Sequence, residues 1–332
     1  MRNKDTDYLH AVARTAYLQS QLVSKGELMK AADAYSAGDA FRLLSGRQIF
    51  KDHSIDEYEH ALESSLEEAY ELVEEITDYS GITSVFRYHT DGHNFKVMVK
   101  NRAVDGDFSC LYKNGGTVEI NVMKSEFDDK AFYHVPEVLG NAVLEAAEEL
   151  ARTGDSQKVD ILIDNGVLAL MGEKAAQLGF RCITDYVTAK IDLINFRTAL
   201  RLMKMKKDTF EASKAFAEGG SFTKMELEEA YSTGFDGLTR LAEKIPQSGK
   251  VKEAITLIKQ GASIGVFELQ ADRCFRNLFE EAGAVPFGIE PIVSYLYLKE
   301  REVRACRMVL ASKLYKLSRD TIRERLGYIY AD

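Results

Sequence analysis

The sequence predicts an all-α protein, and three observations lead to that prediction. Apolar residues recur at spacings of three and four along most of the 332-residue chain, which is the period of an amphipathic helix. The chain has only four prolines and no tryptophan, while alanine, leucine, glutamate and lysine are abundant, as is typical of helices rather than of turn-rich sheets. No alternation of strands and helices is evident, so a doubly wound sheet is not predicted.

Several segments show this helical period clearly. Residues 58–76 place an apolar stripe on one face and glutamates on the other, and residues 227–241 are expected to form one helix. Residues 292–317 are expected to form a long helix, preceded by Pro291 at a favoured first-turn position. Ser318 is then the expected N-cap of a last short helix.

The strand signals in the sequence are weak. Residues 159–164 could form a short strand, but they continue into the helical pattern of 165–178 without a turn signal, so a helix is favoured. Residues 108–112 and 117–122 surround a glycine pair and could form two further short strands.

Charge and cysteine content exclude several classes of protein. Fifty-two acidic residues against 43 basic ones give a net charge of −9, which argues against nucleic-acid binding over a broad basic face. The four cysteines form no CxxC pair, so we expect reduced, mostly buried thiols. The N-terminal residues lack the apolar segment of a signal peptide, and uncharged runs reach only about ten residues where a membrane span needs about twenty. No direct membrane insertion is expected.

The most informative pattern is a repeat of long period. Three segments share a polar residue, an apolar one and a basic one, and they start at Asp91, Asp192 and Lys299, which are 101 and 107 residues apart. The shared residues are Asn94-Phe95-Lys96, Asn195-Phe196-Arg197 and Glu302-Val303-Arg304. Glycine doublets follow the first two copies, Gly327 follows the third, and Asp164 and Asp272 precede the second and third at near-equal distance.

This repeat predicts three related helical units of roughly a third of the chain each. We place them at residues 1–93, 94–194 and 195–332. The third unit stops half-way, and the chain begins with helical material that lacks an upstream partner. We therefore expect the terminal helices to pack together and to close a three-part ring or funnel.

The repeated polar residues are the candidate site, with two interpretations. In the first, Asn94, Lys96, Asn195, Arg197, Glu302 and Arg304 form buried hydrogen bonds and ion pairs that hold each unit together. In the second, they contact a partner protein. Since residues two apart on a helix point to different faces, one member of each pair could bond within its unit while the other faces outward.

Other candidate chemistry is better explained by structure. His89 and His93 have the spacing of zinc ligands, but no third strong ligand is evident, so a polar helical turn is favoured. The doublets Gly115-Gly116 and Gly219-Gly220 match no phosphate-binding motif and are expected to terminate helices. Glutamate pairs are expected on solvated helix faces, and no nucleophile motif is present. No catalytic residue, cofactor or metal is therefore expected.

A family resemblance covers nearly the whole chain. Residues 287–304 (FGIEPIVSYLYLKEREVR), continuing through Arg307, Lys313 and residues 322–326, resemble the C-terminal signature of the C subunits of V-type (V/A-type) ATPases and ATP synthases, which are related to the d subunit of eukaryotic V-ATPases. The segment from Asp192 to Arg197 and the second glycine doublet resemble the middle unit of that family.

The resemblance implies a funnel of three similar helical domains around a pseudo-three-fold axis. It also implies a non-catalytic rotor component that joins the central stalk, formed by the D and F subunits, to the membrane proteolipid ring. Such a component lies peripherally on the cytoplasmic side and transmits torque between ATP turnover and ion translocation. The alternative is a helical-repeat scaffold that docks other proteins, although such scaffolds have shorter repeats.

Overall fold

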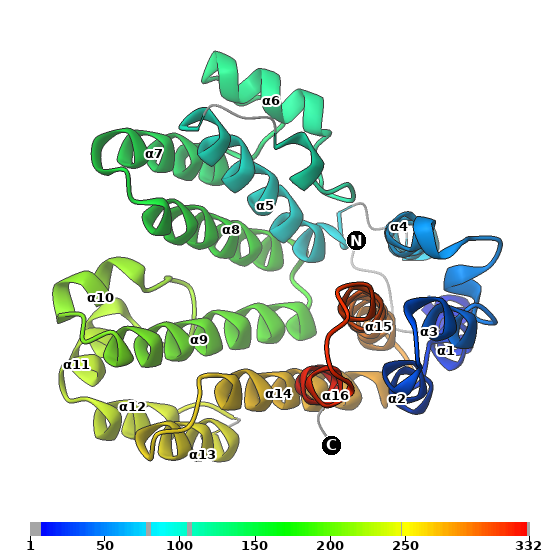
Figure 1. The fold of residues 1–332 in the computed structure, drawn as a ribbon. Coiled ribbons are helices and arrows are strands. Elements are labelled where there is room, and N and C mark those ends of the chain that lie inside the picture. Colours follow the sequence, from blue (N-terminus) through cyan, green and yellow to red (C-terminus); the bar gives the residue numbers. More distant parts are fainter. Residues whose placement is uncertain (1–7, 78–80, 105–107, 247, 331–332) are drawn as a thin grey trace. The chain divides into compact units, whose positions relative to one another are not determined.

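The computed structural model describes residues 8–77, 81–104, 108–246 and 248–330, and over these residues it is all-helical. The expected all-α class is confirmed, since helices are joined there by turns and loops and no strand is present (Figure 1). The chain divides into two compact units. The first combines residues 1–80 with 265–332, and the second comprises residues 81–264.

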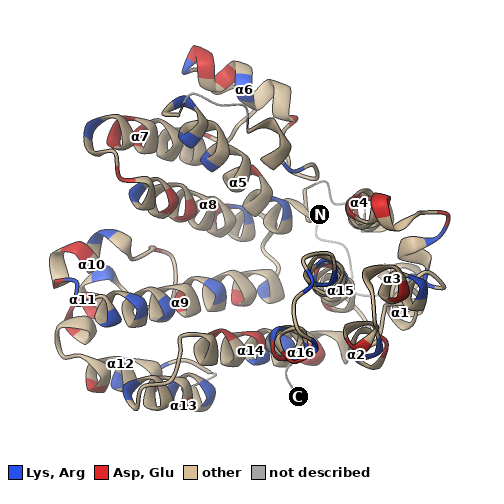
Figure 2. Cartoon of the chain, viewed as in Figure 1, with Lys and Arg blue, Asp and Glu red and all other residues tan. Residues whose placement is uncertain are grey.

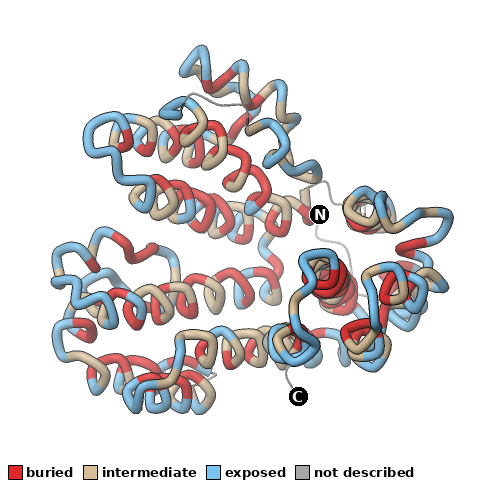
Figure 3. The backbone as a smooth tube through the Cα atoms, viewed as in Figure 1, coloured by how far each residue is buried: buried red, intermediate tan, exposed pale blue. Residues whose placement is uncertain are grey.

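The first unit joins the two ends of the sequence. Its elements are α1 (Leu9–Ser20), α2 (Lys25–Asp33), α3 (Ala37–Leu44), η2 (Gln48–Phe50), η3 (Ile55–Glu57), α4 (Tyr58–Thr77), α14 (Gly265–Gly283), α15 (Glu290–Leu314) and α16 (Arg319–Ile329). Helices α2 and α3 share one apolar core with α15 and α16, in which Leu28, Leu44, Leu310 and Leu326 are fully buried. Helix α15 is buried along most of its length (Figure 3). Arg323 on α16 also binds Asp33 on α2 through two bonds of 2.6 Å.

The second unit follows the chain without interruption. Its elements are α5 (Ser84–Arg102), η4 (Ser109–Leu111), α6 (Ile120–Asp129), α7 (Glu137–Thr153), α8 (Ser156–Leu178), α9 (Arg181–Lys204), α10 (Thr209–Ala215), α11 (Lys224–Ser232), α12 (Phe235–Ala242) and α13 (Ser248–Lys259). Helix α8 packs against α5, α7 and α9 (Figure 1). Phe95 on α5 and Phe196 on α9 are fully buried, as expected for the apolar position of the repeat.

Most of the expected helices are confirmed. Helix α4 covers the predicted stripe, α15 carries Pro291 in its first turn, and Ser318 caps α16 through the Thr321 amide. The favoured helix at residues 159–164 is confirmed as part of α8. The possible strands at 108–112 and 117–122 are instead the short helix η4 and the start of α6.

Two sequence predictions are wrong. Residues 227–241 do not form one helix, because Gly234 adopts a φ of +79° and separates α11 from α12. The glycine doublets terminate no helix either: α5 ends at Arg102 and α10 at Ala215, well before them. The first glycine of each doublet does adopt a positive φ, at Gly115 and Gly219, but within a loop.

The expected unit boundaries fall inside helices. Residues 93 and 94 both lie on α5, and residues 194 and 195 both lie on α9. These boundaries therefore mark equivalent positions in successive copies of the repeat, and no helix ends at them.

Candidate functional site

On α9, the repeated asparagine fixes the loop that follows the helix. The amide of Asn195 donates to the Ala217 carbonyl at 2.9 Å and accepts from the Ala217 N–H at 2.8 Å. Both residues are buried. One turn earlier, Asp192 accepts the Ser221 N–H at 2.8 Å. Asn195 and Asp192 together hold the loop between α10 and α11 against α9, and we call this arrangement the α9 anchor.

Helix α5 carries the same arrangement. Asn94 donates to the Lys113 carbonyl and accepts from the Lys113 N–H, both at 2.9 Å. Asp91 accepts the Thr117 N–H at 3.0 Å and the Thr117 hydroxyl at 2.6 Å. This α5 anchor and the α9 anchor therefore use the same residue types at the same helical spacing to bind a loop further along the chain.

The second glycine of each doublet belongs to its anchor. A Cβ placed at Gly116 would collide with Oδ1 of Asp91, and one at Gly220 would collide with Oδ1 of Asp192. The absence of a side chain allows the loop backbone to approach the carboxylate closely. The doublets are thus explained by anchoring of the loop rather than by helix termination.

On α15, the third copy binds the opposite end of the chain. Glu302 is 2% exposed and accepts the Val23 N–H at 2.6 Å and the Lys299 ammonium at 2.7 Å. Lys299 occupies the position of the aspartate in the other two copies and is also buried. This α15 anchor therefore replaces the Asp–Asn pair with an ion pair, and its bound loop comes from the N-terminal segment. Gly327 takes no part in this arrangement, because it lies within α16.

The segment after Val23 has its own counterpart in the second unit. Ser24 and Glu27 form a capping box at the start of α2, and Thr223 and Glu226 form one at the start of α11. In each case the glutamate also binds a basic residue after the next helix. Arg47 donates to Glu27 at 2.6 and 2.7 Å, and Lys244 donates to Glu226 at 2.8 Å. The N-terminal segment and α2 therefore correspond to the loop before α11 and to α11 itself. In each case a loop bound by the anchor of a long helix leads into a capped helix.

The long-period repeat does not include this second correspondence, but the sequence contains a separate signal for it. Residues 24–28 read SKGEL and residues 223–227 read TKMEL, which is one shared pattern of cap, lysine, glutamate and leucine. The serine or threonine followed three residues later by glutamate marks a helix start in both.

The basic residues of the repeat have separate environments. Lys96 on α5 binds Asp164 on α8, and its side chain is 21% exposed. Arg304 on α15 lies 3.6 Å from Asp272 on α14, and its side chain is 58% exposed. Arg197 is half-buried on α9. The two aspartates noted before the second and third repeat copies are therefore partners of repeat lysine and arginine side chains.

The pKa shifts of the buried anchor aspartates and of the exposed capping glutamate Glu226 have opposite directions. Burial raises the pKa of Asp91 and Asp192, although hydrogen bonds from Thr117 and Ser221 oppose the rise. The bond from Lys244, reinforced by Thr223, lowers the pKa of Glu226 to about 2. Burial thus disfavours the charged form of the anchor aspartates, and their hydrogen-bond donors offset part of that effect.

The other candidate groups make ordinary contacts. His89 faces the Phe86 carbonyl and His93 faces the Leu111 carbonyl at 2.9 Å. No group of three or more His, Cys, Asp or Glu side chains suited to a metal ion occurs in the part of the chain that the structure describes. No disulfide joins the four cysteines, all of which the structure describes, and Cys274 and Cys306 are buried. Among the described helices, none is long and apolar enough to cross a membrane.

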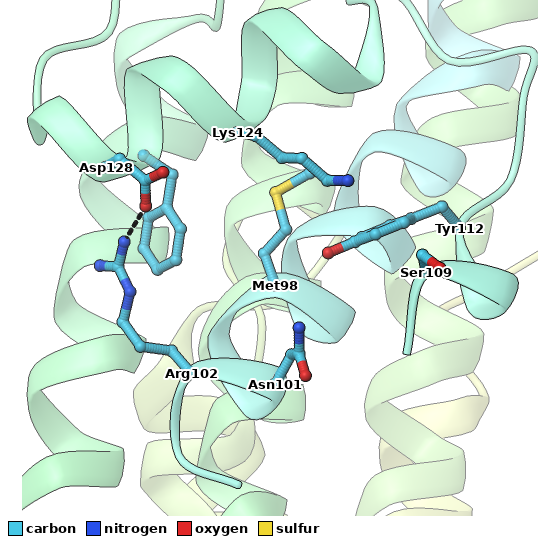
Figure 4. Close-up of a pocket in the computed structure, with 8 residues that line it drawn as sticks. Met98, Asn101, Arg102, Ser109, Tyr112, Lys124 and Asp128 are labelled. Carbon is cyan, nitrogen blue, oxygen red and sulfur yellow. Dashed lines mark hydrogen bonds and ion pairs between the residues drawn. The ribbon is translucent and has the colours of Figure 1, made fainter. Parts of the chain in front are cut away.

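A hollow of about 270 Å³ lies between α5 and α6 (Figure 4). Its charged groups are already engaged within the unit. Arg102 stacks on Phe127 at 4.1 Å and binds Asp128, and Lys124 lies 4.3 Å from the centre of the Tyr112 ring. This hollow is therefore explained by packing of α6 on α5.

The chain is similar to C subunits of V-type and A-type complexes from several organisms. The C subunit of the V-type sodium ATPase of Enterococcus hirae is 20% identical over 286 residues, which cover 85% of this chain and 87% of that protein. The C subunit of the A-type ATP synthase of Halorubrum lacusprofundi is 23% identical over 295 residues, which cover 82% of this chain and 81% of that protein. Its counterpart from Haloquadratum walsbyi is 30% identical over 144 residues, covering 42% and 40%.

The family model described as ATP synthase (C/AC39) subunit matches residues 11–325. This range contains the α5, α9 and α15 anchors and the N-terminal segment that Glu302 binds. The chain therefore belongs to the ATP synthase (C/AC39) subunit family, a family of rotary ATPase subunits.

Proposed function

We propose that this chain is a non-catalytic rotor component of a V/A-type ATPase or ATP synthase. In this role it is a socket that joins the central stalk, formed by the D and F subunits, to the membrane proteolipid ring. It transmits torque between ATP turnover and ion translocation, and it lies peripherally on the cytoplasmic side. Family membership supports the assignment of the chain to such a complex, and the arrangement of the anchors supports the role proposed within it.

One observation carries the proposal: the anchor recurs on α5, α9 and α15, and the third copy binds the N-terminal segment. We propose that the three helices are the centres of three similar units arranged as a funnel around a pseudo-three-fold axis. Three wedge-shaped units around an axis would leave a concavity in which a stalk can be seated. Because packed helical interiors resist deformation, such a body would also transmit torque.

The exposed or half-buried basic residues are the proposed partner contacts. Asn94, Asn195 and Glu302 are at most 2% exposed and bind the chain's own backbone, so they position loops rather than offer a surface. Lys96, Arg197 and Arg304 keep accessible area. We therefore assign partner contact to these three basic residues.

Native mass spectrometry of the purified chain mixed with the D–F pair and the detergent-solubilised ring tests the role. We expect a complex that contains one copy of this chain and both partners. Binding to neither would contradict the proposal and favour a scaffold for other proteins.

A charge-reversal triple variant tests the contact residues. K96E/R197E/R304E should weaken binding to the stalk or the ring while its circular dichroism spectrum stays helical. The matched control is K158E/K252E/R323E, which makes the same charge change at basic residues that bind Glu149, Glu243 and Asp33. Equal binding by both triples would overturn the assignment of these contacts.

A further inference from the structure

An arginine cluster on one face of α14 and α15 surrounds a single carboxylate. Asp272 on α14 is influenced by Arg276 on its own helix and by Arg301 and Arg304 on α15. Arg304 lies 3.6 Å from Asp272, and Arg276 lies 3.6 Å from Glu280. Three guanidinium groups therefore lie around Asp272, in a chain of net charge −9.

The hydrogen-bonding capacity of the cluster is not used up. Oδ2 of Asp272, and Nε and Nη1 of Arg301, are buried without a hydrogen-bond partner among the described residues. The Arg301 guanidinium lies 4.5 Å from the centre of the Tyr330 ring, which covers it on one side. Buried groups of this kind are nearly always paired in folded proteins, so Asp272 and Arg301 each have capacity for a further hydrogen bond.

Arg304 is the accessible member of the cluster. Its side chain is 58% exposed, whereas that of Asp272 is 12% exposed. A separation of 3.6 Å exceeds the 2.7–2.9 Å typical of a charge-assisted hydrogen bond, so Asp272 does not hold Arg304 in one position. Burial also raises the pKa of Asp272 to about 6, against the influence of Arg304, Arg301 and Arg276, which further weakens its hold on Arg304.

Basic residues are frequent along the sequence that contains Arg301 and Arg304. Residues 299–326, on α15 and α16, contain nine lysines and arginines against four acidic residues, while α4 in the same unit carries seven glutamates and no lysine or arginine (Figure 2). Arg304, with a side chain that is 58% exposed, presents its positive charge to an approaching partner, which favours an acidic segment.

We propose that Arg304, which has Arg301 and Asp272 beside it, is the docking point for an aspartate or glutamate side chain of a partner protein in the complex. The incoming carboxylate binds the Arg304 guanidinium through two parallel N–H···O bonds, and Asp272 is then left to Arg301. This inference rests on the proposed function, because it defines the chemistry of one of its contact residues.

The first test uses a fluorescein-labelled penta-glutamate peptide and the full chain, with fluorescence anisotropy as the readout. Arg304→Ala should weaken peptide binding about ten-fold or more, because a charge-assisted bidentate contact is lost. The peptide affinity of Arg304→Lys should lie between those of the wild type and Arg304→Ala, since lysine keeps the charge but not the forked donor geometry of arginine. Asp272→Asn should tighten binding, because it removes the competing carboxylate. The matched control, Arg323→Ala, removes one exposed arginine of α16 that binds Asp33 and should change nothing.

The second test repeats these variants with the D–F pair, with the detergent-solubilised ring and, separately, with vesicles containing 30% phosphatidylglycerol. Peptide binding that depends on Arg304, without binding of the wild-type chain to D–F or the ring, would support the carboxylate site and contradict the proposed function. Wild-type binding to D–F or the ring that is unchanged in Arg304→Ala and Asp272→Asn would overturn the site and leave the function standing. Arg304-dependent binding to the vesicles alone would assign the cluster to lipid phosphate and overturn the proposal.

Discussion

The α9 and α15 anchors solve the same structural problem with different chemistry. On α9, the neutral amide of Asn195 binds a loop that lies 22 residues further along the chain. On α15, the charged pair Lys299–Glu302 binds Val23, which is 279 residues away in sequence. In both, a buried side chain at the centre of a long helix fixes the backbone of a loop that leads into a capped helix.

The two anchors bridge very different distances in sequence. Closing a loop of 279 residues rather than 22 costs about 2 kcal/mol more in chain entropy. Both anchors include a bond from a backbone N–H to a carboxylate, from Ser221 to Asp192 and from Val23 to Glu302, so this bond does not offset the difference. The core shared by α2, α3, α15 and α16 offsets it instead. The comparison teaches that the position of an anchor is retained while its chemistry changes.

The largest expected effect comes from breaking the α15 anchor. Glu302→Ala leaves the Lys299 ammonium buried without a partner and removes the acceptor of the Val23 N–H, so we expect a loss of about 3–5 kcal/mol in the free energy of unfolding. Urea denaturation followed by circular dichroism measures it. The exchange variant K299D/E302N, which installs the α9 pair, should be less destabilised than Glu302→Ala. If the exchange variant is as unstable as the single variant, the two anchors are not equivalent.

The α9 anchor should be the next most sensitive. Asn195→Ala leaves the N–H and carbonyl of buried Ala217 unpaired, with an expected cost of about 2–3 kcal/mol. Asn94→Ala should cost about 1–2 kcal/mol, because Lys113 is exposed and water can replace the lost bonds. Denaturation of both variants gives the two values. A larger loss at Asn94 would contradict this ranking.

These anchors also show how far the sequence predicts the structure. The helical period locates α4, α8 and α15, and the long repeat locates all three anchor positions. The long repeat does not predict the Val23–Glu302 bond, because it does not include the N-terminal segment; the shared SKGEL and TKMEL patterns are the signal for that segment. The glycine doublets do not predict their role, because glycine suits a positive φ at a helix terminus and in a loop equally well. The break at Gly234 was missed because its neighbours keep the apolar spacing of one helix.

A smaller effect tests the role of the second glycine in each doublet. Gly220→Ala places a methyl group against Oδ1 of Asp192 and should cost about 1–3 kcal/mol through overpacking. In a double-mutant cycle with Asp192→Ala, the two losses should not add, since the smaller residue removes the collision. Additive losses would separate the glycine from the anchor. Gly154→Ala tests a glycine with positive φ whose Cβ would meet nothing, and should show no coupling to Asp192.

The smallest expected effect is a pH dependence at Asp192. Its pKa is raised by burial, so the folded chain binds a proton more tightly than the unfolded chain does. As the pH falls from neutral through the raised pKa, the wild type should therefore gain stability relative to Asp192→Asn. The gain should be complete below the ordinary aspartate pKa of about 3.9. Denaturation of both proteins between pH 7 and pH 3.5 gives the difference, and a relative loss on acidification would contradict the assigned direction.

The most direct test of the three-unit socket is an electron cryo-microscopy structure of this chain bound to the D–F pair and the proteolipid ring. We predict one copy of the chain, in which the units centred on α5, α9 and α15 are related by three-fold rotations about one axis. That axis should coincide with the axis of the ring, with the stalk seated between the units and Arg304 against an acidic partner residue. Units that share no axis, or a stalk bound elsewhere on the chain, would contradict the account.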